Sequence, residues 1–176
     1  MNDYPQVHLR AIEPEDLDLL YRIENDQTLW HLGTSNVPYS RYSLHDYVAT
    51  SSDDIYVDRQ VRMIVENDAS ETVGIADVVN FDPANRRAEV GLIVMEAFRQ
   101  QGYGSSVLSE IARYALGVLH LHQVYAFVDC RNEASLNLFR KMGYQESSVI
   151  ADWLYDGCEY RDAVLMQLVF GSFFKY

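Results

Sequence analysis

The sequence is short of three features that would indicate particular classes of protein: cysteine, positive charge and long apolar runs. Its only two cysteines are Cys130 and Cys158, too few for a disulfide scaffold, and no Cys-x-x-Cys pair suggests a zinc ribbon or a thioredoxin-type site. The start of the chain lacks the apolar core of a signal peptide. No apolar run approaches the roughly 18 residues of a membrane span. We therefore expect a cytoplasmic protein without a membrane partner.

The charge balance narrows the range of partners. Lysine and arginine total 14 against 26 aspartates and glutamates, which gives a net charge of −12. Nucleic-acid binding in general needs a basic face that displaces counterions, so no nucleic-acid partner is expected. An acidic surface instead concentrates cationic ligands. The 176 residues are 48% hydrophobic, enough for a buried core, and at about 150 residues per domain they predict one domain over 1–176.

Changes in hydrophobic periodicity predict an α+β fold. Alternating apolar and polar residues indicate strands, and apolar residues three or four positions apart indicate helices. Strands are expected at 7–12, 60–66, 73–81, 87–95, 123–128, 144–150 and 160–170, and helices at 13–24, 43–50, 104–119 and 132–142. Ser43 is the expected cap of the second helix, with Asp46 three residues on. The middle strands form an antiparallel meander, and the strands on either side of helix 104–119 should be parallel.

A glycine-rich turn, Arg99-Gln100-Gln101-Gly102-Tyr103-Gly104-Ser105, lies between a strand and a long helix. Amides at a helix start point outward with partial positive charge, so they bind phosphate. Glycines let the backbone approach the anion without an intervening side chain. The alternative is a tight turn that needs glycine only for its geometry. The turn is not a P-loop, because no Gly-Lys-Ser/Thr follows, and the third glycine of the dinucleotide fingerprint is absent.

This turn resembles the Arg/Gln-x-x-Gly-x-Gly/Ala turn of the GNAT superfamily of acetyl-coenzyme A-dependent N-acyltransferases. Asn132-Glu133-Ala134-Ser135 and Leu138-Phe139-Arg140-Lys141-Met142-Gly143-Tyr144 resemble its second signature, an Asn-x-x-Ala/Ser helix that ends in Lys-x-Gly-Phe/Tyr. The likeness spans nearly the whole chain and is strongest from Arg86 to Tyr144. Within the superfamily, Arg86-Arg87-Ala88-Glu89 and the segment from Asp156 to Asp162 are most similar to the spermidine N-acetyltransferase and ribosomal-protein-alanine acetyltransferase branch.

The resemblance implies a mixed, mostly antiparallel sheet flanked by helices, with two central strands splayed apart. It also implies acetyl-CoA as co-substrate and no metal. Asn132 would hydrogen-bond the pantetheine arm, although Asn is equally a preferred helix N-cap. Arg140 and Lys141 would either meet the adenosine 3′-phosphate or only stabilise a helix end. The implied contacts are Arg99, Gln101, Gly102, Tyr103, Gly104 and Ser105 for the pyrophosphate, and Leu92, Ile93 and Val94 for the pantetheine arm.

The implied reaction is direct acetyl transfer to a primary amine, with no covalent enzyme intermediate, so Cys130 need not be a nucleophile. For the general base, Glu89 is the first candidate and Asp152 the second, with a salt bridge or a surface acid as the ordinary alternatives. The family's usual acid is a tyrosine at the position of Phe139, which has no proton to give. Ser135 is the substitute candidate, although a first-turn hydroxyl commonly contacts local backbone. The thiolate could also leave with help only from water.

Acidic and aromatic residues gather in the pieces expected to line the acceptor site, and such residues suit an extended cation. They are Glu13, Glu15, Asp16, Asp18, Glu24, Asp26, Asp53, Asp54, Asp58, Trp30, Tyr39, Tyr42, Tyr47, Trp153 and Tyr155. A polyamine such as spermidine is the natural candidate. Two alternatives stay open: acetylation of the α-amino group of a ribosomal or other protein with a basic N-terminus, and a non-catalytic CoA-binding sensor. His31 and His45 could titrate usefully, and a homo-oligomer is left open.

Overall fold

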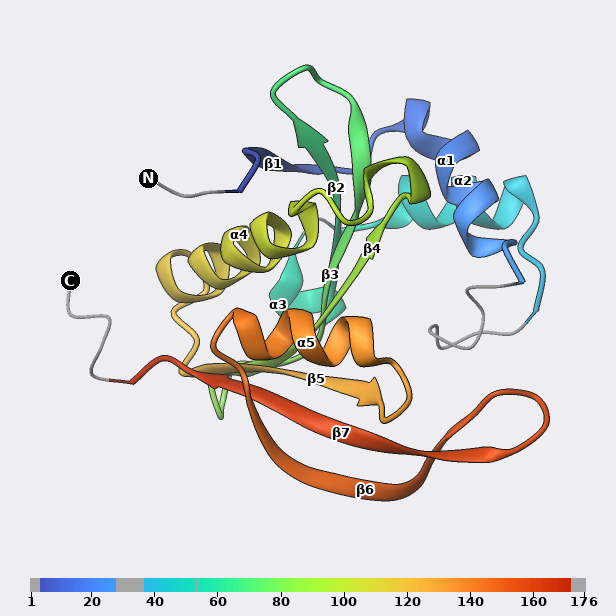
Figure 1. The fold of residues 1–176 in the computed structure, drawn as a ribbon. Coiled ribbons are helices and arrows are strands. Elements are labelled where there is room, and N and C mark those ends of the chain that lie inside the picture. The colour runs from blue at the N-terminus through green and yellow to red at the C-terminus, as the bar shows by residue number, and fades with distance from the viewer. Residues whose placement is uncertain (1–3, 28–36, 53, 172–176) are drawn as a thin grey trace.

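The computed structural model describes residues 4–27, 37–52 and 54–171. In these ranges the chain forms a seven-stranded sheet with helices on both faces (Figure 1). The strands are β1 (Val7–Ala11), β2 (Val61–Asn67), β3 (Thr72–Asp82), β4 (Arg87–Val94), β5 (Gln123–Asp129), β6 (Gln145–Tyr155) and β7 (Tyr160–Val169). The α-helices are α1 (Leu17–Glu24), α2 (Arg41–Thr50), α3 (Ile55–Asp58), α4 (Tyr103–Gly117) and α5 (Glu133–Lys141), with short 3-10 turns at Pro14–Asp16 and Glu96–Phe98. No described helix is long and apolar enough to cross a membrane.

The sheet confirms the expected α+β class. Its strand order is β1-β2-β3-β4-β5-β7-β6, and every neighbouring pair is antiparallel except β4 and β5. The parallel pair is the one that flanks α4, as the periodicity predicted. Parallel strands need a crossover connection, and α4 supplies it.

The central strand pair is splayed. Strands β4 and β5 pair only from Arg87–Gln123 to Glu89–Tyr125, although β4 continues to Val94 and β5 to Asp129. Beyond Glu89 the two strands separate, and their facing backbone groups no longer form a ladder. This divergence, which the family resemblance implied, places an opening in the middle of the sheet.

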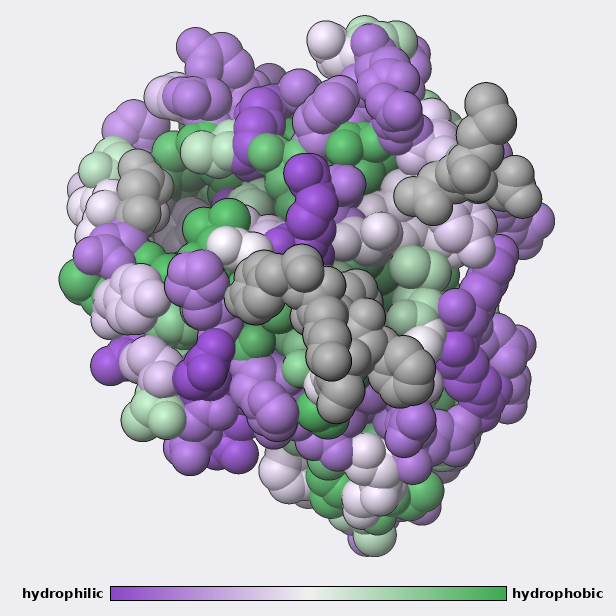
Figure 2. Space-filling view, turned by 90° about the vertical axis from the view of Figure 1, so that its left-hand side faces the viewer, coloured by the Kyte–Doolittle hydropathy of each residue, from purple (hydrophilic) through white to green (hydrophobic). Residues whose placement is uncertain are grey.

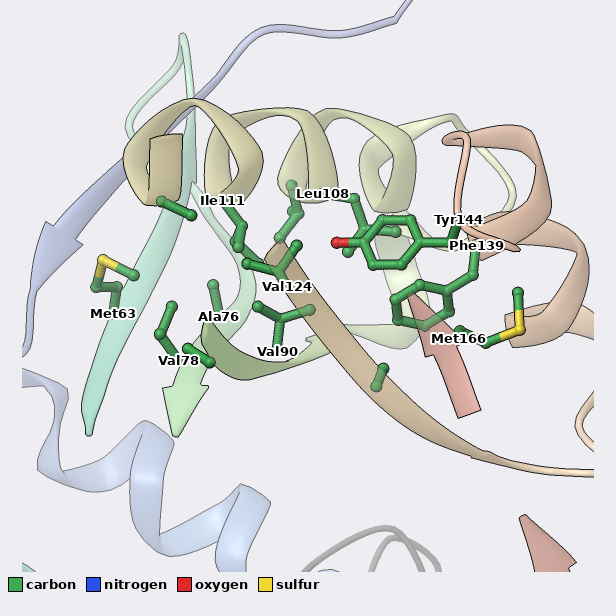
Figure 3. Close-up of a cluster of buried hydrophobic side chains, with 14 of the residues drawn as sticks. Met63, Ala76, Val78, Val90, Leu108, Ile111, Val124, Phe139, Tyr144 and Met166 are labelled. Atoms are coloured by element: carbon green, nitrogen blue, oxygen red, sulfur yellow. The ribbon is translucent and has the colours of Figure 1, made fainter. Parts of the chain in front are cut away.

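Two apolar clusters hold the layers together. Helices α4 and α5 cover one face of the sheet, and Figure 3 shows Val78 and Val90 pointing toward Ile111 on the underside of α4. Helices α1 and α2 cover part of the other face through Leu20 and Leu44. Successive side chains of a strand point to opposite faces, so Met63 and Val65 belong to the first cluster and Ile64, between them, belongs to the second. On the face shown in Figure 2 hydrophilic residues dominate, with smaller hydrophobic areas between them.

Three features differ from the sequence expectations. Helix α2 begins at Arg41, and its cap is Ser40, whose side chain accepts from the Ser43 amide at 3.0 Å, so the predicted cap at Ser43 was wrong. The apolar periodicity is clear only from Leu44 onward, so the sequence pattern did not indicate the first turn of α2. Strand β6 runs to Tyr155, beyond the expected end at 150, and the four-residue helix α3 is too short to show a period. Trp30, His31 and Asp53 lie outside the described residues.

Tyr144 has an unusual environment for a polar side chain. Its ring packs edge-on against Phe139, with 4.9 Å between centroids, and the residue is only 4% exposed. Its hydroxyl points along the underside of α4 (Figure 3) and has no hydrogen-bond partner among the described residues. Burial accordingly raises the pKa of this hydroxyl.

Replacing Tyr144 with phenylalanine should stabilise the protein. A buried hydroxyl without a partner costs about 1–3 kcal/mol, so Tyr144→Phe is expected to raise the free energy of unfolding by about 1–2 kcal/mol in urea titrations. Tyr144→Leu is the matched control, because it removes the same hydroxyl together with ring volume and should destabilise. A fall in stability for Tyr144→Phe would mean that the hydroxyl has a partner.

Candidate active site

A cavity of about 400 Å³ opens where β4 and β5 separate and extends across the sheet toward α1 and α2. One end is lined by the diverging strands and by α5. The other end is lined by β2, β3, α1 and α2. The sheet register brings these ends together, because Arg62, Asp77 and Gly91 lie side by side on β2, β3 and β4.

The end between the splayed strands contains residues that the sequence had singled out. Leu92, Ile93, Asn132, Ser135 and Phe139 all line it. Beyond Glu89, the edge of β4 is free of β5, so an extended ligand could pair with it as an added strand. The cavity therefore suits a narrow, amide-bearing chain such as a pantetheine arm.

Asn132 caps α5. Its side-chain oxygen accepts from the Ser135 amide at 3.0 Å, which confirms the N-cap interpretation. The oxygen is engaged by the helix, while the same residue lines the cavity. Capping and ligand binding are therefore compatible at this position, because the amide group has donors besides its oxygen.

The opposite end of the cavity holds a cluster of charged residues. Arg62 donates to both carboxylate oxygens of Asp77, at 2.7 Å and 3.1 Å, and it also pairs with Glu24. Burial alone would lower the pKa of the Arg62 guanidinium, but the charge and hydrogen bonds of Asp77 and the charge of Glu24 outweigh burial and raise it. Tyr47 lies beside the cluster, and burial raises the pKa of its hydroxyl while the Arg62 charge opposes that shift.

Glu89 lies where the splay begins. It forms the last β4–β5 pair, opposite Tyr125, and the cavity lining starts one residue later, at Val90. Its side chain accepts a hydrogen bond from Asn80 at 2.8 Å. Burial raises the pKa of the Glu89 carboxyl, and the Asn80 bond opposes this only in part. The carboxylate is therefore biased toward accepting a proton beside the cavity.

Ser135 and Asp152 occupy different kinds of position. Ser135 is half-buried and lines the cavity one turn from Phe139. Asp152 is exposed on β6, does not line the cavity, and has a left-handed φ of 51° in an irregular stretch between Ile150 and Leu154. Its amide donates to the Asp162 carboxylate at 3.0 Å. Of the two carboxylates Glu89 and Asp152, Glu89 is therefore the one that lies beside the cavity.

The glycine-rich turn forms the start of α4. Gly102 is the N-cap, with a left-handed φ of 90° and no side-chain cap. The amides of Gly102, Tyr103 and Gly104 donate to no acceptor in the described part of the chain, whereas the Ser105 amide donates to the Gly102 carbonyl. Three amides at the start of this 15-residue helix are therefore left for an external acceptor, and helix starts of this kind can bind anions.

The side chains of this turn are mostly engaged within the protein. Arg99 Nε donates to the Val94 carbonyl at 2.9 Å, and the Gln101 side chain donates to the Ala97 carbonyl at 2.7 Å. Tyr103 packs against Phe98, and Ser105 is buried. If this turn holds a pyrophosphate, backbone amides rather than side chains therefore supply most of the contacts.

The two glycines also have close neighbours within the protein. A Cβ on Gly104 would lie 2.9 Å from Leu138 Cδ2, so this glycine lets α4 approach α5. A Cβ on Gly102 would lie 3.2 Å from Pro5 and 3.5 Å from Tyr4, at a φ that side chains rarely adopt. The sequence interpretation left two roles open for these glycines, space for an anion or the geometry of a tight turn, and the structure adds their neighbours within the protein.

Arg140 and Lys141, the two basic residues in the last turn of α5, differ in their surroundings. Arg140 is paired with Glu133 and Glu146. Lys141 Nζ lies 4.8 Å above the ring of Tyr4. In space, Tyr4 lies close to Gly102. Of the two, Lys141 is the one placed beside the glycine turn. Among the described residues no cluster of histidine, cysteine or carboxylate side chains could hold a metal ion.

The splayed sheet, its cavity and the uncapped helix start are the features that the resemblance to the GNAT acetyltransferases implied. A family model described as an acetyltransferase (GNAT) domain matches residues 6–145. The chain therefore belongs to the GNAT acetyltransferases and is an acetyl-CoA-dependent N-acetyltransferase.

Individual relatives agree with this class. The chain is 27% identical over 162 residues to the spermidine N(1)-acetyltransferase of Escherichia coli K12, covering 91% of this chain and 84% of that one. It is 26% identical over 168 residues to a putative ribosomal N-acetyltransferase, YdaF, of Bacillus subtilis, covering 93% and 91%. Among solved structures, spermidine N-acetyltransferase from Vibrio cholerae in complex with CoA and spermine shares the fold, with a TM-score of 0.83, 21% identity and coverage of 93% and 95%.

Sequence reasoning missed many of the residues that line the cavity, among them Arg62, Asp77 and Gly91. The first two were read only as parts of a hairpin. Their one sequence signal is that both are charged residues inside otherwise apolar strands, where an unpaired charge is costly. That signal indicates an ion pair but not the cavity beside it.

Proposed function

We propose that this enzyme acetylates a primary amine of a polyamine such as spermidine by direct transfer from acetyl-CoA. The observation that carries the proposal is the continuous cavity, which joins the splayed strands to an acidic and aromatic end. That end presents Glu24, Asp77, Tyr39 and Tyr47, and carboxylates with aromatic rings suit a cationic chain. The similarity to spermidine N(1)-acetyltransferase supports the same substrate class.

Acetyl-CoA supplies an activated acyl carbon, and the chain's residues meet the remaining requirements. The amides of Gly102, Tyr103 and Gly104 would hold the pyrophosphate, and the free edge of β4 would align the pantetheine arm. Backbone N–H groups of β4 would face the thioester oxygen, where negative charge develops. The amine nitrogen would add to the thioester carbon, which puts the negative charge on the oxygen, and the carbon–sulfur bond would then break to release the CoA thiolate.

Glu89 would take the proton that the amine loses, directly or through a water molecule, because an ammonium ion has no lone pair for attack. Ser135, in the first turn of α5, would give a proton to the departing thiolate. Phe139 lines the same cavity and cannot do so. A thiolate is a fairly good leaving group, so water could serve in place of Ser135.

An acceptor panel tests this proposal. Thiol release from acetyl-CoA should be measured with spermidine, spermine and diamines, and separately with peptides that carry basic N-termini. We expect turnover with the polyamines and an acceptor KM that rises with salt, since screening weakens the attraction of the acidic end. Preference for the peptides would instead support α-amino acetylation. Firm acetyl-CoA binding by calorimetry with no turnover of any amine would favour a CoA-binding sensor.

A further inference from the structure

Gly91 lies at the middle of the cavity, between its two ends. It is two residues beyond Glu89 on β4 and pairs directly with Asp77 on β3. A Cβ built on Gly91 would have one neighbour within 4 Å beyond its adjacent residues, the Asp77 Cβ at 3.9 Å, which is an ordinary van der Waals contact. Gly91 is also absent from the glycines with left-handed φ. Neither backbone conformation nor close packing therefore requires glycine here.

What glycine does provide at this position is a wider cavity, because it has no side chain. Side chains of a strand stand perpendicular to the sheet, and Gly91 and Asp77 share the face that lines the cavity. A side chain on residue 91 would project into the passage between the splayed strands and the charged end. It would leave the hydrogen-bonding edge of β4 unchanged, because that edge lies in the plane of the sheet.

The charged end beyond Gly91 presents the carboxylates of Asp77 and Glu24 to the cavity. Both are paired with the guanidinium of Arg62. An acceptor that carries a further cationic nitrogen beyond its reacting amine would be attracted to these carboxylates.

We infer that Gly91 sets the width of the acceptor passage, and that the Glu24–Arg62–Asp77 cluster holds one ammonium group of the acceptor beyond it. The enzyme would then select unbranched primary aminoalkyl cations. It would exclude amines that are branched at the carbon bearing the nitrogen, which includes the α-amino group of a peptide. This inference rests on the proposed function and specifies which amines the site accepts.

Three four-carbon amines separate width from charge: n-butylamine, sec-butylamine and 1,4-diaminobutane. For the wild type, kcat/KM should be at least about tenfold higher for n-butylamine than for its branched isomer. The branch places one extra carbon against the side of the passage, and one carbon in a pocket typically changes kcat/KM by about 10–200-fold. It should be higher again for 1,4-diaminobutane, which carries the second ammonium. Asp77→Asn should remove most of the advantage of 1,4-diaminobutane over n-butylamine.

Gly91→Ala and Gly91→Val test the passage itself. We expect kcat/KM for spermidine to fall about tenfold in the first and about 100-fold in the second. The affinity for acetyl-CoA by calorimetry should stay within about twofold of wild type, which a misfolded variant would not show. Gly117→Ala is the matched control, because a Cβ there has nothing within 4 Å, and it should behave as wild type.

The outcomes separate this inference from the proposed function. If the wild type turns over spermidine and Gly91→Val is equally active, Gly91 does not set the width of the acceptor passage. Equal rates for the branched and unbranched butylamines would do the same. A wild type inactive toward every amine in the panel would overturn the proposed function and this inference with it.

Discussion

Replacing Glu89 with glutamine is expected to lower kcat by about 10²–10⁴-fold, the usual cost of losing a general base. Glutamine keeps the shape of the side chain but cannot take the amine's proton. The KM for acetyl-CoA should change little, because Glu89 lies at the closed end of the splay and not along the free edge of β4. Steady-state kinetics with spermidine as acceptor measure both constants.

The pH dependence of the rate is a second test of Glu89 as the base. Burial raises the pKa of the Glu89 carboxyl, so the wild-type rate should fall as pH drops through that raised value and the carboxylate becomes protonated. The defect of Glu89→Gln should shrink at high pH, where more of the acceptor is already deprotonated. If the same pattern appears in Asp152→Asn and not in Glu89→Gln, Asp152 is the base.

Asn80 offers a third test of the same assignment. Its amide donates to Glu89 and so opposes the upward pKa shift. Asn80→Gly removes the amide and tolerates the left-handed φ of 50° at this position. The acid limb of the rate profile should then move to higher pH. An unchanged profile would show that Glu89 does not control that limb.

Replacing Arg62 with methionine is expected to lower the free energy of unfolding by about 2–3 kcal/mol, because it leaves Asp77 without its guanidinium in a partly buried site. The acceptor KM should change as well, since the cluster would lose its geometry. Urea unfolding measures the first effect.

Arg62→Lys is the matched control for this variant. Lysine keeps the positive charge but cannot donate to both oxygens of Asp77 in the fork geometry of arginine. Its loss of stability should therefore be smaller than that of Arg62→Met. Equal losses in the two variants would contradict the electrostatic account and indicate a packing effect instead.

Particular residues show how much of the fold and of the site could be predicted from the sequence. The period change after Val94 placed α4 and β5 correctly, because long amphipathic helices and short apolar strands differ strongly in pattern. The uncapped start of α4 follows from Gly102 and Gly104, whose order was plain in the sequence. The splay of β4 from β5 came from the family resemblance, since no local pattern encodes where pairing stops.

Other parts of the site depend on long-range register. Arg62 and Asp77 are 15 residues apart, and Glu24 lies 38 residues before Arg62. Only the pairing of β2 with β3 and the packing of α1 bring them into one cluster. Asp152 shows the reverse case, because the irregular stretch of β6 turns that residue outward and no sequence signal announced it.

The short β4–β5 ladder also governs how the sheet holds together. Three residue pairs join the half made of β1 to β4 to the half made of β5, β7 and β6, so this seam is the weakest in hydrogen bonds. Amides along its open part should exchange with solvent readily, while those inside each half are protected. A strand-like ligand in the seam would supply the missing ladder. Its binding energy would then add to the coupling between two halves that are otherwise joined by this short ladder and by the apolar cluster they share.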